Sequence, residues 1–140
     1  MMQTTDYPRR QMIEAALKRQ PDAIVATTIR LWEQLAPELI SIIGEGGFNS
    51  LYSRSVRLAG AKHPWMPKNG KPPVPDQRFA ELHACLQAQD AAQAGHGSRA
   101  LFNIFLDLLG SLIGEALTTH LLHSAWRQEA FEIPAKDFPT

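Results

Sequence analysis

Residues 98–126 read SRALFNIFLDLLGSLIGEALTTHLLHSAW and decide the fold class of this chain. Polar side chains recur every three to four residues, and nearly all other positions are apolar; the polar set is Asn103, Asp107, Ser111, Glu115 and Thr118/Thr119. Such a period is typical of an α-helix and not of a β-strand. A helix with one narrow polar stripe requires cover on most of its circumference. We therefore predict one continuous helix, capped by Ser98, at the centre of a soluble bundle, with its acids on one side.

A transmembrane span is the alternative for this stretch, because a bilayer crossing needs about 20 apolar residues. Asp107 and Glu115 argue against it, since an acid at the centre of a span costs roughly 2.5–3.5 kcal/mol on insertion scales. Gly110 and Gly114 form a GxxxG pair. That pair favours dimerisation in a membrane, or close helix approach in a soluble core. We favour the soluble core and predict no membrane partner.

The composition is that of an ordinary globular protein and limits the classes of partner. The 140 residues suit one domain, and a content of 44% hydrophobic and 20% charged residues argues against disorder. Fourteen cations balance fourteen anions, so we expect no nucleic-acid partner. The single cysteine, Cys85, excludes an intrachain disulfide. Residues 1–10 contain no apolar signal core, which predicts a cytoplasmic protein.

Four shorter helices are expected ahead of the central one. Apolar spacing places them at residues 8–20, 22–43 and 48–59, and from 79 until the glycines at 95–97, with Asp76 as a candidate N-cap. Pro37 interrupts the second helix, so we expect a kink or break at 34–37. That helix should end at the three glycines of residues 44–47, and Gly60 should follow the third.

The chain is predicted to be all-α, a bundle of four to five helices in a single domain spanning 1–140. Residues 61–76 contain five prolines and should form a long loop. Residues 1–7 and 129–140 are expected to be flexible ends. Neither strand-like alternation nor an internal repeat is apparent.

The clearest candidate site is a basic region that follows a glycine-rich turn. No acidic residue occurs between Glu45 and Asp76. A glycine-rich turn at the start of a helix exposes N–H groups that hold anions. The candidate anion- or partner-binding set is Gly46, Gly47, Ser50, Arg54, Arg57 and Lys62. The competing interpretation, which we favour, is a glycine turn followed by a solvated basic face, because the GEGG run lacks the lysine of a phosphate-binding loop.

Trp65 is the other candidate for partner binding. A tryptophan in a proline-rich loop either anchors a partner or folds back as a lid over the core, and the sequence leaves both open. Pro64–Pro67 and Pro72–Pro75 fit a PxxP pattern, which proline-rich loops also match by chance.

No set of residues predicts catalysis, a cofactor or a metal. His120 and His123 lie three apart with Glu115 nearby, whereas metalloprotease histidines are four apart with an adjacent glutamate. His83 lacks the lysine and glycine that follow the histidine of phosphorelay domains. Cys85 has no adjacent base and suits a small buried position. We predict a non-enzymatic protein with no catalytic residue.

Two stretches carry a resemblance, EGGFNSLYSRSVRLAGAKHPW at 45–65 and LIGEALTTHLLHSAW at 112–126. They resemble uncharacterised helical domains of bacterial two-component signalling proteins. The resemblance implies regulation and no catalytic residue. Our hypothesis is a regulatory or protein-interaction module in bacterial signalling that binds a protein partner and self-associates as a homo-oligomer. The alternative is a helical sensor for a small molecule or anion.

Overall fold

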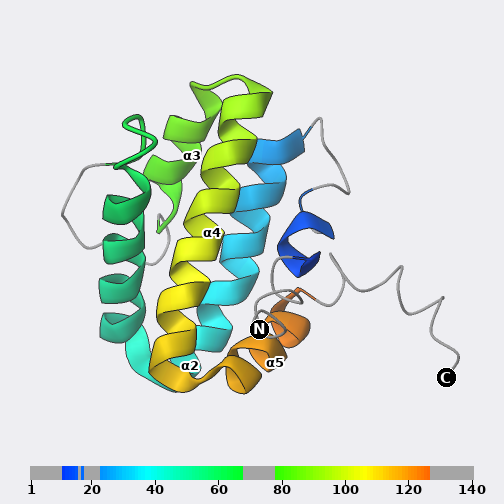
Figure 1. Ribbon diagram of the computed structural model, residues 1–140, viewed down its shortest axis with the longest axis vertical. Coiled ribbons are helices and arrows are strands. Elements are labelled where there is room, and N and C mark those ends of the chain that lie inside the picture. Colours follow the sequence, from blue (N-terminus) through cyan, green and yellow to red (C-terminus); the bar gives the residue numbers. More distant parts are fainter. Residues whose placement is uncertain (1–10, 16, 18–22, 68–77, 127–140) are drawn as a thin grey trace, which may run out of the picture.

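Helices account for all the regular structure in the described part of the chain. The computed structural model describes residues 11–15, 17, 23–67 and 78–126. Its helices are α2 (Ile24–Ala59), α3 (Ala80–Gln87), α4 (Ala91–Ile113) and α5 (Glu115–Ala125), and residues 11–15 and 17 form a short N-terminal helix (Figure 1). No strand occurs among these residues, so the all-α prediction is confirmed. The predicted flexible ends, 1–7 and 129–140, and residues 68–76 of the predicted loop lie outside the described residues.

α2 consists of two helical arms that meet at Gly44. The first arm covers residues 24–43 and the second covers 45–59, which runs back beside α4 (Figure 1). Gly44 has φ 85° and ψ 161°, a backbone conformation open essentially to glycine alone. The chain therefore reverses at a single residue, and the second arm begins earlier than the predicted residue 48. Its end at Ala59, before Gly60, is as predicted.

Of the kink or break predicted at 34–37, the break is wrong, because the first arm continues through Pro37. Pro37 lacks the N–H that would donate to the Glu33 carbonyl. Both residues are exposed, so the carbonyl is not enclosed in the apolar core. On the other side of the helix, Leu35 and Leu39 are fully buried, and their burial holds the arm together.

The central stretch is not the continuous rod that its periodicity predicts. α4 ends at Ile113 and α5 begins at Glu115, on either side of Gly114, which has φ 97° and ψ 153°. α5 turns away from the α4 axis toward the first arm of α2 (Figure 1). There the Trp126 Nε1 donates a hydrogen bond to the Leu31 carbonyl at 3.0 Å. Asp107 and Glu115 consequently belong to different helices.

α4 also begins earlier than predicted. Asp90, not Ser98, is its N-cap, because the Asp90 side chain accepts a hydrogen bond from the Gln93 N–H at 2.8 Å. Residues 95–97 thus lie inside α4 and do not separate two helices, while α3 already ends at Gln87. Small size is required at Gly97, since a Cβ there would lie 2.3 Å from a ring atom of Trp65. Close packing against Trp65 explains a glycine that sequence rules interpret as a helix breaker.

The first arm of α2 and α4 form an internal repeat, so the expectation of no repeat is wrong. Both helices run in the same direction (Figure 1). Residues 70 positions apart meet between them: the Thr28 hydroxyl donates to the Ser98 hydroxyl at 2.9 Å. The rings of Trp32 and Phe102 stack with centroids 4.6 Å apart. Parallel helices whose equivalent residues touch are related by an approximate twofold axis between them.

The repeat continues through both glycine corners. Residues 41–45 read SIIGE and residues 111–115 read SLIGE, with Gly44 and Gly114 at equivalent positions. Burial follows the same register, and the buried pairs include Leu31/Leu101, Trp32/Phe102, Leu35/Phe105, Ala36/Leu106, Leu39/Leu109, Tyr52/Leu122 and Val56/Trp126. The core is therefore built from two similar helix–glycine–helix units.

Candidate functional site

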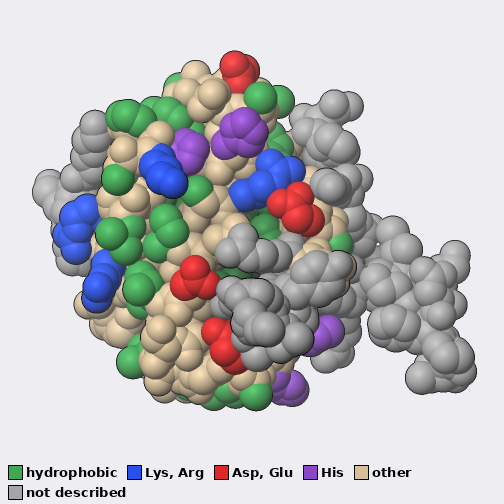
Figure 2. Space-filling model, in the orientation of Figure 1, with side chains coloured by type: hydrophobic (Ala, Val, Ile, Leu, Met, Phe, Trp, Pro, Cys, Tyr) green, Lys and Arg blue, Asp and Glu red, His purple; other side chains and the backbone are tan. Residues whose placement is uncertain are grey.

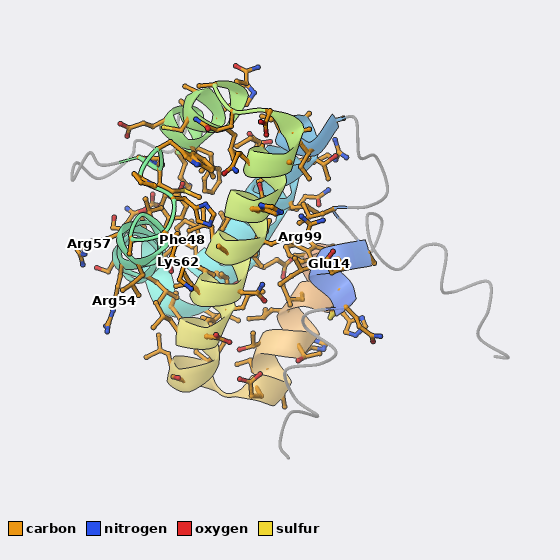
Figure 3. The ribbon with its side chains drawn as sticks, turned by 45° about the horizontal axis from the view of Figure 1, so that its top comes forward. Glu14, Phe48, Arg54, Arg57, Lys62 and Arg99 are labelled. Atoms are coloured by element: carbon orange, nitrogen blue, oxygen red, sulfur yellow. The ribbon has the colours of Figure 1, made fainter. Side chains whose placement is uncertain are left out.

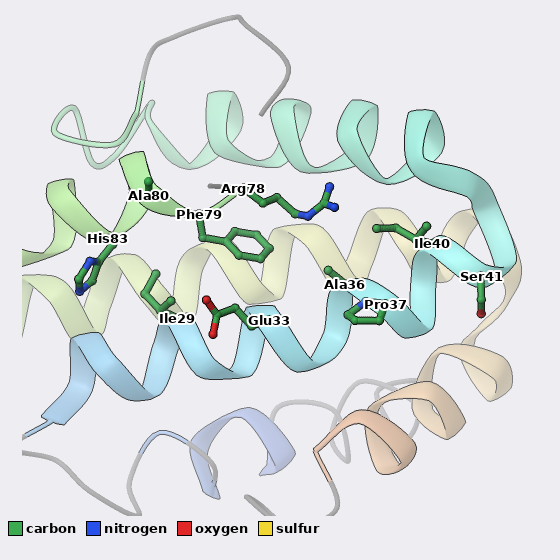
Figure 4. A pocket seen from close by; sticks show the side chains of 10 residues that line it. All are labelled: Ile29, Glu33, Ala36, Pro37, Ile40, Ser41, Arg78, Phe79, Ala80 and His83. Atoms are coloured by element: carbon green, nitrogen blue, oxygen red, sulfur yellow. The ribbon is translucent and has the colours of Figure 1, made fainter. Parts of the chain in front are cut away.

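A groove lies between the first arm of α2 and residues 78–83 (Figure 4). Its volume of about 660 Å³ falls within the range of about 300–1,000 Å³ typical of ligand pockets. The first arm contributes residues spaced three or four apart, which share one face of a helix. The lining consists of Ile29, Glu33, Ala36, Pro37, Ile40, Ser41, Arg78, Phe79, Ala80 and His83. We call this feature the α2–α3 groove.

Arg78 is the most firmly held polar group of the groove. Its side chain is only 10% exposed, and its Nη1 donates to Glu45 Oε2 at 3.1 Å and to Asn49 Oδ1 at 3.2 Å. The guanidinium also lies over the Phe48 ring, 5.4 Å from its centroid. These contacts join the second arm of α2 to residue 78 and fix the wall of the groove. Because Glu45 pairs with Arg78, the guanidinium adds little net positive charge.

Glu33 supplies an exposed carboxylate on the opposite wall (Figure 4). One turn further along, the Pro37 nitrogen cannot donate to the Glu33 carbonyl, so a backbone acceptor is left on the groove side of the helix. His83 adds a half-buried imidazole. Apolar walls with a few polar groups are typical of a site that orients a bound ligand.

The predicted anion-binding residues do not converge on one point. Gly46, Ser50 and Arg54 follow one exposed line of the second arm, but Arg54 lies two helical turns, about 12 Å, beyond Gly46. Arg54 and Arg57 point outward (Figure 3), and Lys and Arg side chains lie along this edge of the surface (Figure 2). At the glycine end, Glu45 already places a carboxylate near the N–H groups of the first turn. The arrangement therefore resembles the competing interpretation, a solvated basic face. Lys62 is also exposed on this face, and Gly47 is half-buried.

Trp65 folds back onto the bundle. Its ring is half-buried against Gly97 and lies 5.7 Å from the His63 ring, while the neighbouring Met66 is 2% exposed. Of the two interpretations that the sequence leaves open, this packing favours a lid over the core of α4.

The described residues contain no group of three or more His, Cys, Asp or Glu side chains that could hold a metal ion. His120 and His123 are exposed, and partial burial together with the neighbouring His120 lowers the pKa of His123. Glu115 folds back over Gly110. Burial and the Glu81 carboxylate raise the pKa of the Cys85 thiol, which keeps it in the less reactive protonated form.

Sequence analysis missed the groove, although a weak signal for it exists. Ile29 and Ile40 lie outside the buried stripe of the first arm, and each is only half-buried. Their spacing places them on a second apolar face, interrupted by Glu33 and Pro37. Arg78 could not be identified from the sequence as a groove residue, because its partners, Glu45 and Asn49, are 33 and 29 residues away.

A scan against models of protein families, a search of curated proteins and a search of solved structures each found no match for this chain. None of the described helices combines the length and the apolar character that a bilayer crossing requires.

Proposed function

We propose that this chain is a non-catalytic regulatory module that binds a partner protein through the α2–α3 groove. The observation that carries the proposal is a groove of about 660 Å³ with apolar walls, in which Arg78 is fixed by Glu45, Asn49 and Phe48. A fixed wall lowers the entropic cost of ordering the site on binding. A role in bacterial signalling remains a prediction from the resemblance alone.

A small-molecule sensor is the second candidate for the same groove. The volume of about 660 Å³ supports it, because this volume lies in the range of small-molecule pockets. The two candidates differ in how much surface the occupant covers: a small molecule stays inside the groove, whereas a protein segment also contacts the surface around it.

Methyl NMR of the full chain, labelled at isoleucine, tests whether the groove binds at all. A library of small apolar fragments should contain members that shift the Ile29 and Ile40 methyls and leave the Ile104 methyl on α4 unchanged. Ala80→Trp, on the exposed start of α3 where it lines the groove, should abolish these shifts by filling the space.

Ala84→Trp is the matched control, because Ala84 is also exposed on α3 but does not line the groove. It should leave the fragment shifts intact. A library without any hit at Ile29 and Ile40, or hits that persist unchanged in Ala80→Trp, would contradict the proposal.

Self-association is a separate part of the proposal. Ile42 is 46% exposed, and its counterpart Leu112 in the repeat is 63% exposed. Both precede a glycine corner, and Leu117, 38% exposed, follows the second corner. Exposed apolar side chains at one end of a bundle support an interface. Sedimentation velocity should reveal a concentration-dependent dimer that Ile42→Ser/Leu112→Ser removes; a monomer at every concentration would refute it.

A further inference from the structure

We infer that this chain is a covalently joined dimer, made of two equivalent three-helix units that recognise each other as two separate chains would. The interaction surface is the inner face of each unit, and the partner that it fits is a unit of the same kind. This surface is distinct from the exposed apolar side chains at the glycine corners.

The repeat extends to a third helix in each half of the molecule. Shifted by 70 residues, the N-terminal helix falls on α3. Both short helices precede the long helix of their half, and both contribute buried apolar side chains, namely Met12, Ile13 and Leu17 in one and Leu82 and Leu86 in the other. The first unit therefore consists of the N-terminal helix and the two arms of α2, and the second consists of α3, α4 and α5 (Figure 1).

Every helix of the first unit touches the second unit. The N-terminal helix does so through Glu14, whose Oε2 accepts a hydrogen bond from the Arg99 Nε of α4 at 2.7 Å (Figure 3). The first arm of α2 does so through its contacts with α4 on the twofold axis. The second arm does so through Phe48, whose ring centroid lies 5.7 Å from that of Phe105 in α4.

The outer helices of the second unit return these contacts. Phe79, the N-cap residue of α3, has its ring centroid 5.7 Å from that of Trp32 and 5.4 Å from that of Tyr52. Trp126, the C-cap residue of α5, donates its hydrogen bond to the Leu31 carbonyl of the first arm. The side chains of one unit thus complete the core of the other.

Neither unit encloses a core of its own. Trp32, Phe48, Phe102 and Phe105 are fully buried, and each has a ring of the other unit against it. A unit of this size without its partner would expose that aromatic surface, as in obligate dimers that have no stable folded monomer. The covalent connection then raises the effective concentration of one unit for the other.

Cutting the connection in the otherwise full chain tests the inference. A recognition sequence for a site-specific protease is inserted between Asn69 and Gly70, in the Ile42→Ser/Leu112→Ser background that removes association through the corners. After cleavage, both fragments should remain in one particle in native mass spectrometry. Each fragment separated in urea and refolded alone should show no cooperative unfolding. An equimolar mixture of the two should regain the helical circular dichroism of the cut protein.

The unfolding of the cut protein should also depend on its concentration. A tenfold increase should raise its urea midpoint by roughly 0.5–1.4 M, the shift expected when two chains separate at ordinary denaturant sensitivity. The uncut control with the same insertion should show no such shift. Three results would overturn the inference: fragments that part or aggregate on cleavage, a fragment that unfolds cooperatively alone, or a midpoint of the cut protein that is independent of concentration. Fragment binding to the α2–α3 groove in the uncut chain still tests the proposed function separately.

Exchanging the two rings on the axis is a second measurement, which requires no cut. Phe102→Trp overfills its side of the axis, whereas Trp32→Phe/Phe102→Trp keeps the total volume of the pair. Because equivalent units accept either ring on either side, the double variant should have a higher urea midpoint than Phe102→Trp alone. A midpoint no higher than that of Phe102→Trp would contradict the equivalence of the units.

Discussion

The two halves of the bundle share a register and differ in what covers them. In one half, the first arm of α2 turns at Gly44 into the second arm; in the other, α4 turns at Gly114 into α5. The glutamate after each glycine behaves differently. Glu115 folds back over Gly110, whereas the equivalent position of Gly110 is occupied by Ile40, and Glu45 instead pairs with Arg78.

The two corners therefore differ in what fills the space beside the helix. The absence of a side chain at Gly110 leaves space that the chain fills with its own glutamate. Ile40 instead lines the groove next to Pro37. α3 lines only the opposite end of the groove, near Ile29 (Figure 4). The comparison teaches that two repeats can share a buried core while their outer surfaces differ.

The largest effect should come from breaking the contact on the twofold axis. Trp32 is fully buried, stacks on Phe102 and touches the rings of Tyr52 and Phe105 edge-on. Trp32→Ala should lower the free energy of unfolding by about 3–5 kcal/mol, the usual loss for a large aromatic, as measured by urea denaturation.

Trp32→Phe is the matched variant, because it makes the axial pair Phe–Phe. It should cost much less, since the Trp32 Nε1 has no hydrogen-bond partner among the described residues and its removal forfeits no bond. If Trp32→Ala and Trp32→Phe lowered the free energy of unfolding equally, the stack of Trp32 on Phe102 would not be the centre of the core.

The next largest effect should come from the glycine corners. Gly44→Ala and Gly114→Ala should each lose about 1–3 kcal/mol, because both residues occupy a positive-φ region that alanine avoids. No heavy atom lies within 4 Å of a Cβ built at either site, so the loss is purely one of backbone conformation. Gly46→Ala has equal space but ordinary helical geometry, and it should gain up to about 1 kcal/mol. A large loss at one corner only would mean that the two turns are not equivalent.

Both the successes and the failures of prediction follow from these glycines and their contacts. The helical period of residues 98–113 fixed the fold class, because an apolar stripe shows within a single element. A period cannot reveal that Gly114 reaches φ 97°, since glycine is tolerated both inside and between helices. The Thr28–Ser98 contact spans 70 residues, and the Arg78 contacts with Glu45 and Asn49 span 33 and 29. Such contacts depend on helix packing, so the Arg78 wall of the groove could not be predicted from the sequence.

An effect of similar size is expected from the hydrogen bond between the repeats. Thr28→Val leaves the buried Ser98 hydroxyl without its partner and should cost about 1–3 kcal/mol. The double variant Thr28→Val/Ser98→Ala removes both polar groups, so its loss should be less than the sum of the single losses. A double-mutant cycle measures that difference. Strict additivity would show that the two hydroxyls do not interact.

The smallest effect concerns the ion pair that holds the N-terminal helix. Arg99 and Glu14 have side chains 32% and 38% exposed, so Arg99→Ala should cost only about 0.2–1 kcal/mol, and the cost should fade in 1 M salt. Arg54→Ala is the control, because this exposed arginine lies on the outer face of the second arm, and it should change stability by less than about 0.5 kcal/mol. A loss at Arg99 well above 1 kcal/mol that persists in salt would mean that the arginine acts through packing and not through charge.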